Sequence, residues 1–256
     1  MLTRSGEVRI RWTRWLKAQE YEQAFWRRQA AGIEDGTGGQ LDWYDWKANQ
    51  LEARLASVPN ARPRAGRVLE IGSGPIGIVN SLEWGERYAI EPLERFYRQT
   101  SSLTKLRKPG STYLAGTGER LPLRDGAFSL VIIDNVIDHT YAPAKILQEI
   151  ARVLETAGYL YLVVNVHTRW GAILHGLLAA LRIDKGHPYT FTSPRLRRLL
   201  VRWGFTILRE EVEDYGQVKR TNCRSRRLKE RLKGYLGLSE FQHFVLCSKK
   251  APVGHS

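Results

Sequence analysis

Apolar and polar positions follow two different patterns along the chain from residue 67 onward. Short apolar runs bounded by glycine or charged residues predict buried strands, whereas apolar residues spaced three and four apart predict amphipathic helices. Seven strands are expected, at residues 68–71, 87–90, 111–114, 128–134, 159–166, 205–208 and 241–246. Helices are expected to begin near Pro75, at Pro143 and at Ser193, and the last two are expected to end near Leu154 and Trp203.

Strands that alternate with helices in this way are typical of the α/β class. We therefore expect a Rossmann-like, mostly parallel seven-stranded sheet with helices on both faces. The first 60 residues differ, because they hold five of the eight tryptophans and their apolar residues recur at helical spacing. The chain is thus expected to divide into a Trp-rich helical extension (1–60) and a Rossmann-like domain (61–256) with insertions at about 167–191 and 217–240.

Three segments of the predicted domain carry candidate chemistry. The segment 68–77, VLEIGSGPIG, places Gly72 and Gly74 directly after the first strand. Glycine allows positive φ and leaves no Cβ between the backbone and a ligand. The glycine motif alone also fits dinucleotide-binding proteins. Glu91 ends the second strand, where a carboxylate is able to accept hydrogen bonds from both hydroxyls of a ribose. The third segment, GTGERLPLRDGAF at 116–128, connects the third and fourth strands.

Together these segments resemble the class I S-adenosylmethionine-dependent methyltransferases, in particular their small-molecule, quinone-biosynthesis-like (type 11) group. The resemblance covers roughly residues 66–205 and implies S-adenosyl-L-methionine as the cofactor, with no metal ion. It implies cofactor contacts from Glu70, Gly72, Ser73, Gly74, Glu91, Gly118, Glu119, Asp134 and Asn135. Family members usually carry an aspartate just before the residue matching Glu119, and it contacts the adenine. Here Thr117 and Gly118 occupy that stretch, so backbone groups at Gly118 and Glu119 are expected to replace the contact.

Candidate catalytic residues follow from the reaction that the resemblance implies. Methyl transfer is an in-line displacement, and positioning alone is able to supply as much as about 7–11 kcal/mol. A hydroxyl acceptor must also lose a proton, and histidine is a suitable base near neutral pH. His139 is the first candidate because it matches a family histidine at the pocket, and His167 and His187 are the others. A purely structural role for His139 in its loop stays open.

The insertion after residue 166 carries an apolar stripe. Leu174, Leu177, Leu178 and Leu181 recur at helical spacing. They either roof the pocket together with the N-terminal tryptophans or pack in the core, and the sequence favours core packing.

The formal net charge of +14 is partly clustered. Residues 219–233 hold eight basic residues and one acidic residue, and Leu228, Leu232 and Leu236 predict an amphipathic helix there. Clustered charge suits RNA or an anionic membrane. The 29 arginines against 11 lysines instead indicate a general arginine bias. We therefore expect neither tight RNA binding nor strong membrane binding.

The sequence thus predicts a methyltransferase that acts by O-methylation on a small-molecule or sugar-like acceptor. Three alternatives stay open: an RNA methyltransferase using the basic surface, a methyltransferase of a lipid or quinone at the membrane surface, and a non-catalytic cofactor-binding module. No recognisable RNA-binding module supports the first. Cys223 and Cys247 lack metal-ligand spacing, which favours a reducing, cytoplasmic compartment. No apolar run is long enough for a membrane-spanning helix, although peripheral membrane contact stays open.

Overall fold

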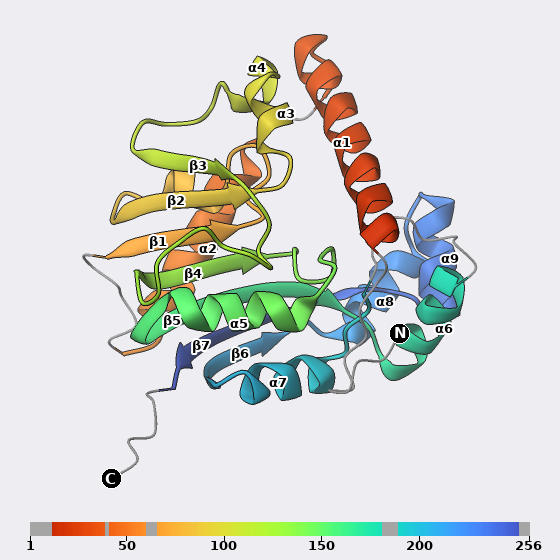
Figure 1. Cartoon of the computed structure of the whole chain (residues 1–256). Helices are drawn as coiled ribbons and strands as arrows, with labels where there is room; N and C mark the ends of the chain where they lie inside the picture. The colour runs from red at the N-terminus through yellow and green to blue at the C-terminus, as the bar shows by residue number, and fades with distance from the viewer. Residues whose placement is uncertain (1–11, 39–40, 60–65, 181–188, 251–256) are drawn as a thin grey trace.

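The computed structural model describes residues 12–38, 41–59, 66–180 and 189–250, with the backbone only at 178–180. Its centre is a seven-stranded sheet in the order β3-β2-β1-β4-β5-β7-β6 (Figure 1). The strands are β1 (Arg67–Ile71), β2 (Glu86–Glu91), β3 (Ser111–Ala115), β4 (Phe128–Asp134), β5 (Leu154–Val166), β6 (Phe205–Val212) and β7 (Phe241–Lys249). β1 to β5 pair in parallel, and β7 runs antiparallel to β5 and β6. The predicted Rossmann-like, mostly parallel sheet is confirmed.

Helices cover both faces of this sheet (Figure 1). The helices are α1 (Trp12–Glu34), α2 (Trp43–Ala56), α3 (Glu94–Arg98), α4 (Ser101–Thr104), α5 (Pro143–Val153), α6 (Arg169–Ala180), α7 (Ser193–Arg202), α8 (Tyr215–Cys223) and α9 (Leu228–Leu236), and the 3₁₀ helix η1 spans Ile78–Ser81. One apolar core joins α5 and α7 to the sheet, for example through Ile150 and Leu200. A second core joins α1 and α2 to the opposite face through residues such as Trp26 and Leu51. The division of the chain near residue 60 stays a prediction.

The segment after the glycine loop differs from the expectation. A helix was expected near Pro75, but the chain forms only η1, which begins at Ile78. Gly77 has φ of +85°, a conformation that no helix residue adopts. The Glu70 carboxylate accepts a hydrogen bond from the backbone N–H of Val79 at 2.9 Å, and this bond satisfies one of the free donors at the start of η1. A buried carboxylate and a left-handed glycine therefore replace the expected first helical turn.

Two connections also differ from the sequence prediction. α5 ends at Val153 and β5 begins at once with Leu154. Early in β5, Ala157 adopts φ of +62° and the register with β4 shifts. The basic stretch forms two helices, α8 and α9, where one was expected. Among the helices that the structure describes, none is both long and apolar enough to cross a bilayer.

Candidate active site

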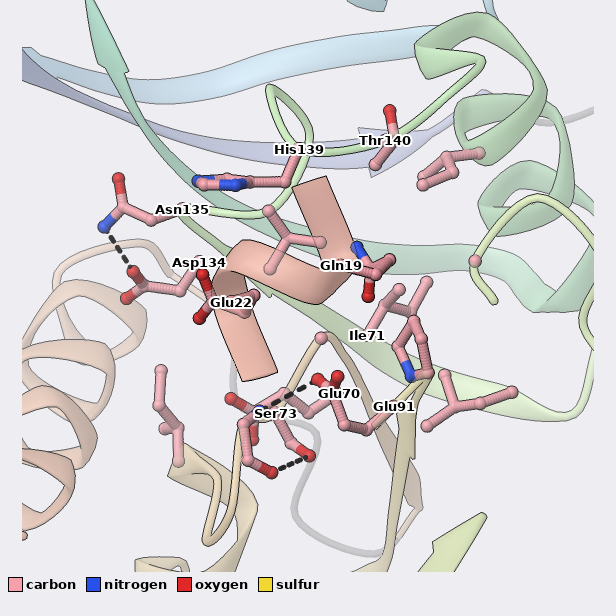
Figure 2. Close-up of a pocket in the computed structure, with 18 of the residues that line it drawn as sticks. Gln19, Glu22, Glu70, Ile71, Ser73, Glu91, Asp134, Asn135, His139 and Thr140 are labelled. Carbon is pink, nitrogen blue, oxygen red and sulfur yellow. Dashed lines mark hydrogen bonds between the residues drawn. The ribbon is translucent and has the colours of Figure 1, made fainter. Parts of the chain in front are cut away.

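A pocket opens at the carboxyl ends of β1, β2 and β4, beneath α1. In open α/β sheets this edge is where ligands bind. The nine expected cofactor contacts and His139 all line the pocket. Figure 2 shows Glu70, Ser73 and Glu91 at one end and Asn135 and His139 at the other, with Gln19 and Glu22 of α1 between them. The fold therefore brings together residues that lie up to 131 positions apart in the chain, from Trp15 to Ile146.

The loop after β1 needs glycine at two positions. Gly72 has φ of +72°, and a Cβ there would lie 2.4 Å from a methyl group of Val136. Gly74 has φ of +62°, and a Cβ there would lie 2.6 Å from the hydroxyl of Tyr44. L-residues rarely adopt this conformation, and neither position has room for a side chain. The loop backbone therefore forms one wall of the pocket directly.

Glu91 at the end of β2 holds the glycine loop in place. One carboxylate oxygen accepts the N–H of Gly74 at 3.1 Å, and the other accepts the N–H of Leu93 at 3.1 Å. A carboxylate offers about four acceptor sites, so each oxygen retains capacity for a ligand hydroxyl. Burial raises the pKa of Glu91 to about 7, against the backbone hydrogen bonds that lower it. Glu91 is thus a buried acceptor facing the pocket.

Glu70 lies on the same side of the pocket and is equally buried. Burial raises its pKa to about 7, and the N–H groups of Val79 and Ile78 oppose that rise. Part of its hydrogen-bonding capacity is used by η1. The sequence alone left open whether Glu70 meets a ligand or only the backbone, and the structure gives it both a backbone partner and a place in the lining.

The connection from β3 to β4 lines one side of the pocket with Gly118 and Glu119. A Cβ on Gly118 would lie 2.7 Å from Ile71 and 2.9 Å from Ile146, so the chain approaches both side chains closely. One carboxylate oxygen of Glu119, Oε1, accepts the N–H groups of Tyr141 and Ala142 at 2.9 and 3.4 Å, so this oxygen holds the loop after β4. Burial raises the pKa of Glu119. Ile71, Ile146 and the backbone at Gly118 therefore offer an apolar slot edged by peptide groups.

The end of β4 carries an ion pair that the sequence did not predict. Asp134 accepts hydrogen bonds from Lys47 of α2 and from the Asn135 side chain, both at 2.8 Å. Asn135 adopts φ of +55°, an uncommon conformation that asparagine tolerates better than most residues. The turn at Asn135 directs the next residues, including His139, back toward the pocket.

The lining of the pocket is strongly acidic. Five carboxylates line it, namely those of Glu22, Glu70, Glu91, Glu119 and Asp134. Lys47 is the one lysine or arginine among the described lining residues. Such a set suits a ligand that carries positive charge and hydroxyl groups. S-adenosylmethionine carries both, together with an adenine that fits an apolar slot, so the residues present match this cofactor.

The three candidate histidines have different positions. His139 lines the pocket, and its Nε2 lies 3.8 Å from a carboxylate oxygen of the buried Asp138, which is too long for a hydrogen bond. His167 is not part of the lining; it is buried and packs against His175 with ring centroids 4.9 Å apart. His187 lies outside the described residues. Of the two candidate histidines that the structure describes, His139 lines the pocket and His167 does not.

The N-terminal helices contribute more to the pocket than the sequence predicted. Their lining residues are Trp15, Gln19, Glu22 and Trp26 of α1 and Trp43, Tyr44 and Lys47 of α2. The clustered tryptophans were the signal, and roofing by them was one of the two expectations. The leucine stripe behaves differently: Leu177 is 58% exposed, so it neither roofs the pocket nor packs in the core. The side chains of Leu178 and Leu181 lie outside the described part of the chain.

Comparisons with known proteins agree with this geometry. Residues 69–162 match the family model described as a methyltransferase domain. The chain is 29% identical over 110 residues to an uncharacterized methyltransferase of Mycobacteroides abscessus, covering 42% of this chain and 41% of that protein. It is 27% identical over 108 residues to an uncharacterized methyltransferase of Schizosaccharomyces pombe, covering 38% of this chain and 39% of that protein. The matches thus span about two fifths of the length of these curated relatives.

Solved structures show the same fold at low sequence identity. A putative methyltransferase of Bacillus halodurans has a TM-score of 0.59 at 16% identity, covering 80% of this chain and 99% of that one. The Haemonchus contortus phosphoethanolamine N-methyltransferase 2 in complex with S-adenosyl-L-methionine has a TM-score of 0.54 at 15% identity, covering 79% and 53%. At such identities the likeness shows the fold.

Proposed function

We propose that this chain, which belongs to the class I S-adenosylmethionine-dependent methyltransferases, catalyses methyl transfer to the oxygen of a small-molecule or sugar-like acceptor. The observation that carries the proposal is the acidic pocket that joins the glycine loop, Glu91 and the turn at Asn135–His139 at one edge of the sheet. When bound, the cofactor supplies a methyl group activated by a sulfonium cation.

The residues of the pocket take distinct roles in this proposal. Glu91 accepts the ribose hydroxyls while its backbone hydrogen bonds keep the carboxylate oriented. Gly118 and Glu119 offer backbone groups to the adenine, and Ile71 and Ile146 contact its faces. Glu70 and Asp134 stabilise the positive charges of the cofactor. The loop from Gly72 to Gly74 allows the close approach that these contacts require.

His139 acts as the general base in this account. Its side chain is 29% exposed at the pocket, so it is accessible to an acceptor hydroxyl. The buried Asp138 carboxylate nearby stabilises the imidazolium that forms when the histidine takes the proton. α1 covers the pocket with Trp15, Gln19 and Glu22, which limits access of water to the reacting groups. Orientation of the acceptor supplies the remainder of the catalysis. We place the reaction in the cytoplasm, since Cys223 and Cys247 are both free thiols.

The proposal is tested by following a labelled methyl group. The protein is incubated with methyl-labelled S-adenosylmethionine and, separately, with pools of small metabolites, total RNA and extracted lipids. We expect label in the small-metabolite pool as a methyl ether or ester, with one demethylated cofactor formed for each methyl transferred. Label in RNA or lipid alone would move the acceptor class to one of the alternatives. Cofactor binding with no label in any pool would favour a non-catalytic binding module.

A further inference from the structure

Two helices at the edge of the sheet expose apolar stripes that no described segment covers. On α6, Trp170, Ile173 and Leu177 are each more than half exposed. They occupy positions i, i+3 and i+7, which lie on one side of a helix. Of the leucines that the sequence analysis expected to pack in the core, Leu177 belongs to this exposed stripe.

The second stripe lies on α9. Leu228, Leu232, Tyr235 and Leu236 are each more than half exposed and again share one side of their helix. The stripes meet, because the indole N–H of Trp170 donates to the carbonyl of Leu236 at 3.1 Å. Gly171 and Gly237 allow this approach, since a Cβ on Gly171 would lie 2.9 Å from the Gly237 carbonyl oxygen. We call the seven residues of the two stripes the α6–α9 surface.

Basic side chains are concentrated on α8, on α9 and on the segment between these two helices. Between Lys219 and Arg231 the chain carries seven basic residues, all exposed, and one acidic residue, Glu230. Within the described part of the chain, none of the seven forms an ion pair, whereas Lys233 is paired with Glu240. Seven cations without an ion pair, next to exposed leucine, isoleucine, tryptophan and tyrosine side chains, are typical of a helix that lies in the interface of an anionic bilayer.

The α6–α9 surface also has a defined place relative to the pocket. α6 follows the carboxyl end of β5, and α8 and α9 follow that of β6, which runs parallel to β5 because both pair antiparallel with β7. Figure 1 shows α6, α8 and α9 grouped beyond these strand ends, on the side to which β1, β2 and β4 also point. The surface and the pocket therefore share one edge of the molecule.

We infer that the α6–α9 surface docks this protein on an anionic membrane, with the apolar stripes entering the interface and the basic residues contacting lipid headgroups. This inference does not depend on the proposed reaction. RNA is the weaker occupant, because five of the seven residues are leucine or isoleucine, which gain little from phosphates or stacked bases. The two aromatic residues are Trp170, whose indole N–H donates to the Leu236 carbonyl, and Tyr235. The exposure of both stripes is the reason to propose membrane binding here, although the charge pattern alone led us to expect no strong binding to RNA or membranes.

Vesicle co-sedimentation of the full chain tests the inference. The vesicles contain phosphatidylcholine alone or phosphatidylcholine mixed with phosphatidylglycerol, and binding is measured at low and at physiological salt. We expect binding to the anionic vesicles that weakens with salt, and little binding to the neutral ones.

Matched variants assign the binding to this surface. The apolar variant carries Ile173→Gln, Leu232→Gln and Tyr235→Gln, and its control carries Leu106→Gln, Val201→Gln and Leu208→Gln at exposed positions elsewhere. The charge variant carries Arg226→Glu, Arg227→Glu and Arg231→Glu, and its control carries Arg28→Glu, Arg124→Glu and Arg198→Glu. Each surface variant should lose at least about tenfold in vesicle partitioning while each control keeps it. Circular dichroism confirms that all four fold.

Three results would overturn the inference. The first is no binding of the parent protein to anionic vesicles at low salt. The second is an equal loss in the control variants, which would make the interaction a general charge effect. The third is a dimer in solution, seen by light scattering, that the apolar variant dissociates without changing vesicle binding, since a second copy would then cover the surface.

Discussion

Lys47 of α2 and Asp134 at the end of β4 form an ion pair with 2.8 Å between Nζ and Oδ1. The pair joins the N-terminal helices to the central strand of the candidate site. Asp134 is 8% exposed and Lys47 is 25% exposed, so solvent screens the interaction only in part. The pair links α2 to β4 and so has a structural role. Because both residues also line the pocket, the pair contributes to the charge of the site.

Removal of this cation should cost stability. Lys47→Met leaves the Asp134 carboxylate buried with the Asn135 side chain as its hydrogen-bond donor, so the free energy of unfolding should fall by about 1–3 kcal/mol. Lys108→Met is the matched control, since Lys108 lies 4.0 Å from Asp45 and both side chains are exposed. The control should change stability by less than about 0.5 kcal/mol. Denaturant unfolding of both variants checks this, and equal losses would contradict the structural role of the pair.

The glycine loop gives a second prediction. Gly74→Ala places a methyl group 2.6 Å from the Tyr44 hydroxyl at φ of +62°, so it should lower both stability and cofactor affinity. Gly36→Ala is the control, because Gly36 has φ of +75° with no atom near the added Cβ, and it should lose only the backbone cost of about 1–2 kcal/mol. Adding Tyr44→Phe to Gly74→Ala should restore part of the loss, as measured by calorimetry. No recovery would show that contact with Tyr44 is not the cause.

Glu91 gives a third prediction. Glu91→Gln keeps the shape of the side chain but removes the charge, and hydrogen bonds to charged groups are worth about 1.5–3 kcal/mol. Affinity for S-adenosylmethionine should therefore fall by at least about tenfold. Glu86→Gln on the same strand is the control, because Glu86 is exposed and pairs with Arg67. If both variants bind as the parent does, the ribose carboxylate is elsewhere.

The raised pKa values of Glu70 and Glu91, each about 7, predict pH-dependent binding. A cationic ligand favours the deprotonated carboxylates, so binding releases protons and affinity should rise with pH. For one such group the gain from about pH 6 to about pH 8 is roughly tenfold. The demethylated product lacks the sulfonium charge and should show a smaller gain. Calorimetry in two buffers of different ionisation enthalpy measures the proton release, and affinity that is independent of pH would contradict this electrostatic account.

His139 provides the test of chemistry as distinct from binding. His139→Gln should reduce kcat for O-methyl transfer by about 10²–10⁴ and leave the Kd of the cofactor unchanged, because a general base acts on the acceptor. Unchanged kcat in the folded variant would leave His139 a structural role in its loop.

The sequence predicted the sheet because its strands are strongly apolar and buried. β4, for example, is buried from Phe128 to Ile133, and its run of mostly apolar residues identifies it from the sequence alone. The methyltransferase family model matches residues 69–162, a range that contains the glycine motif, Glu91 and the 116–128 segment, and the solved structures of methyltransferases share the predicted fold. These features are local in sequence, so one sequence suffices to find them.

What the sequence missed depends on contacts between distant segments. Lys47 lies 87 residues from Asp134, and no spacing rule connects them. The short 3₁₀ helix after the glycine loop arises because Glu70 satisfies the N–H of Val79, a bond that depends on three-dimensional placement. Likewise, periodicity identifies an apolar stripe in α6 but does not tell whether a neighbour covers it, and Leu177 remains exposed.

The central claim is that the acidic pocket binds S-adenosylmethionine, and isothermal titration of the purified chain tests it most directly. The account predicts saturable binding of S-adenosylmethionine and of its demethylated product, with the cationic cofactor preferred above about pH 7 because Glu70 and Glu91 are then charged. It also predicts no binding of NAD(H), since the glycine loop leads into a short 3₁₀ helix and offers no long helix N-terminus to a pyrophosphate. Binding of NAD(H) without binding of S-adenosylmethionine would contradict the account.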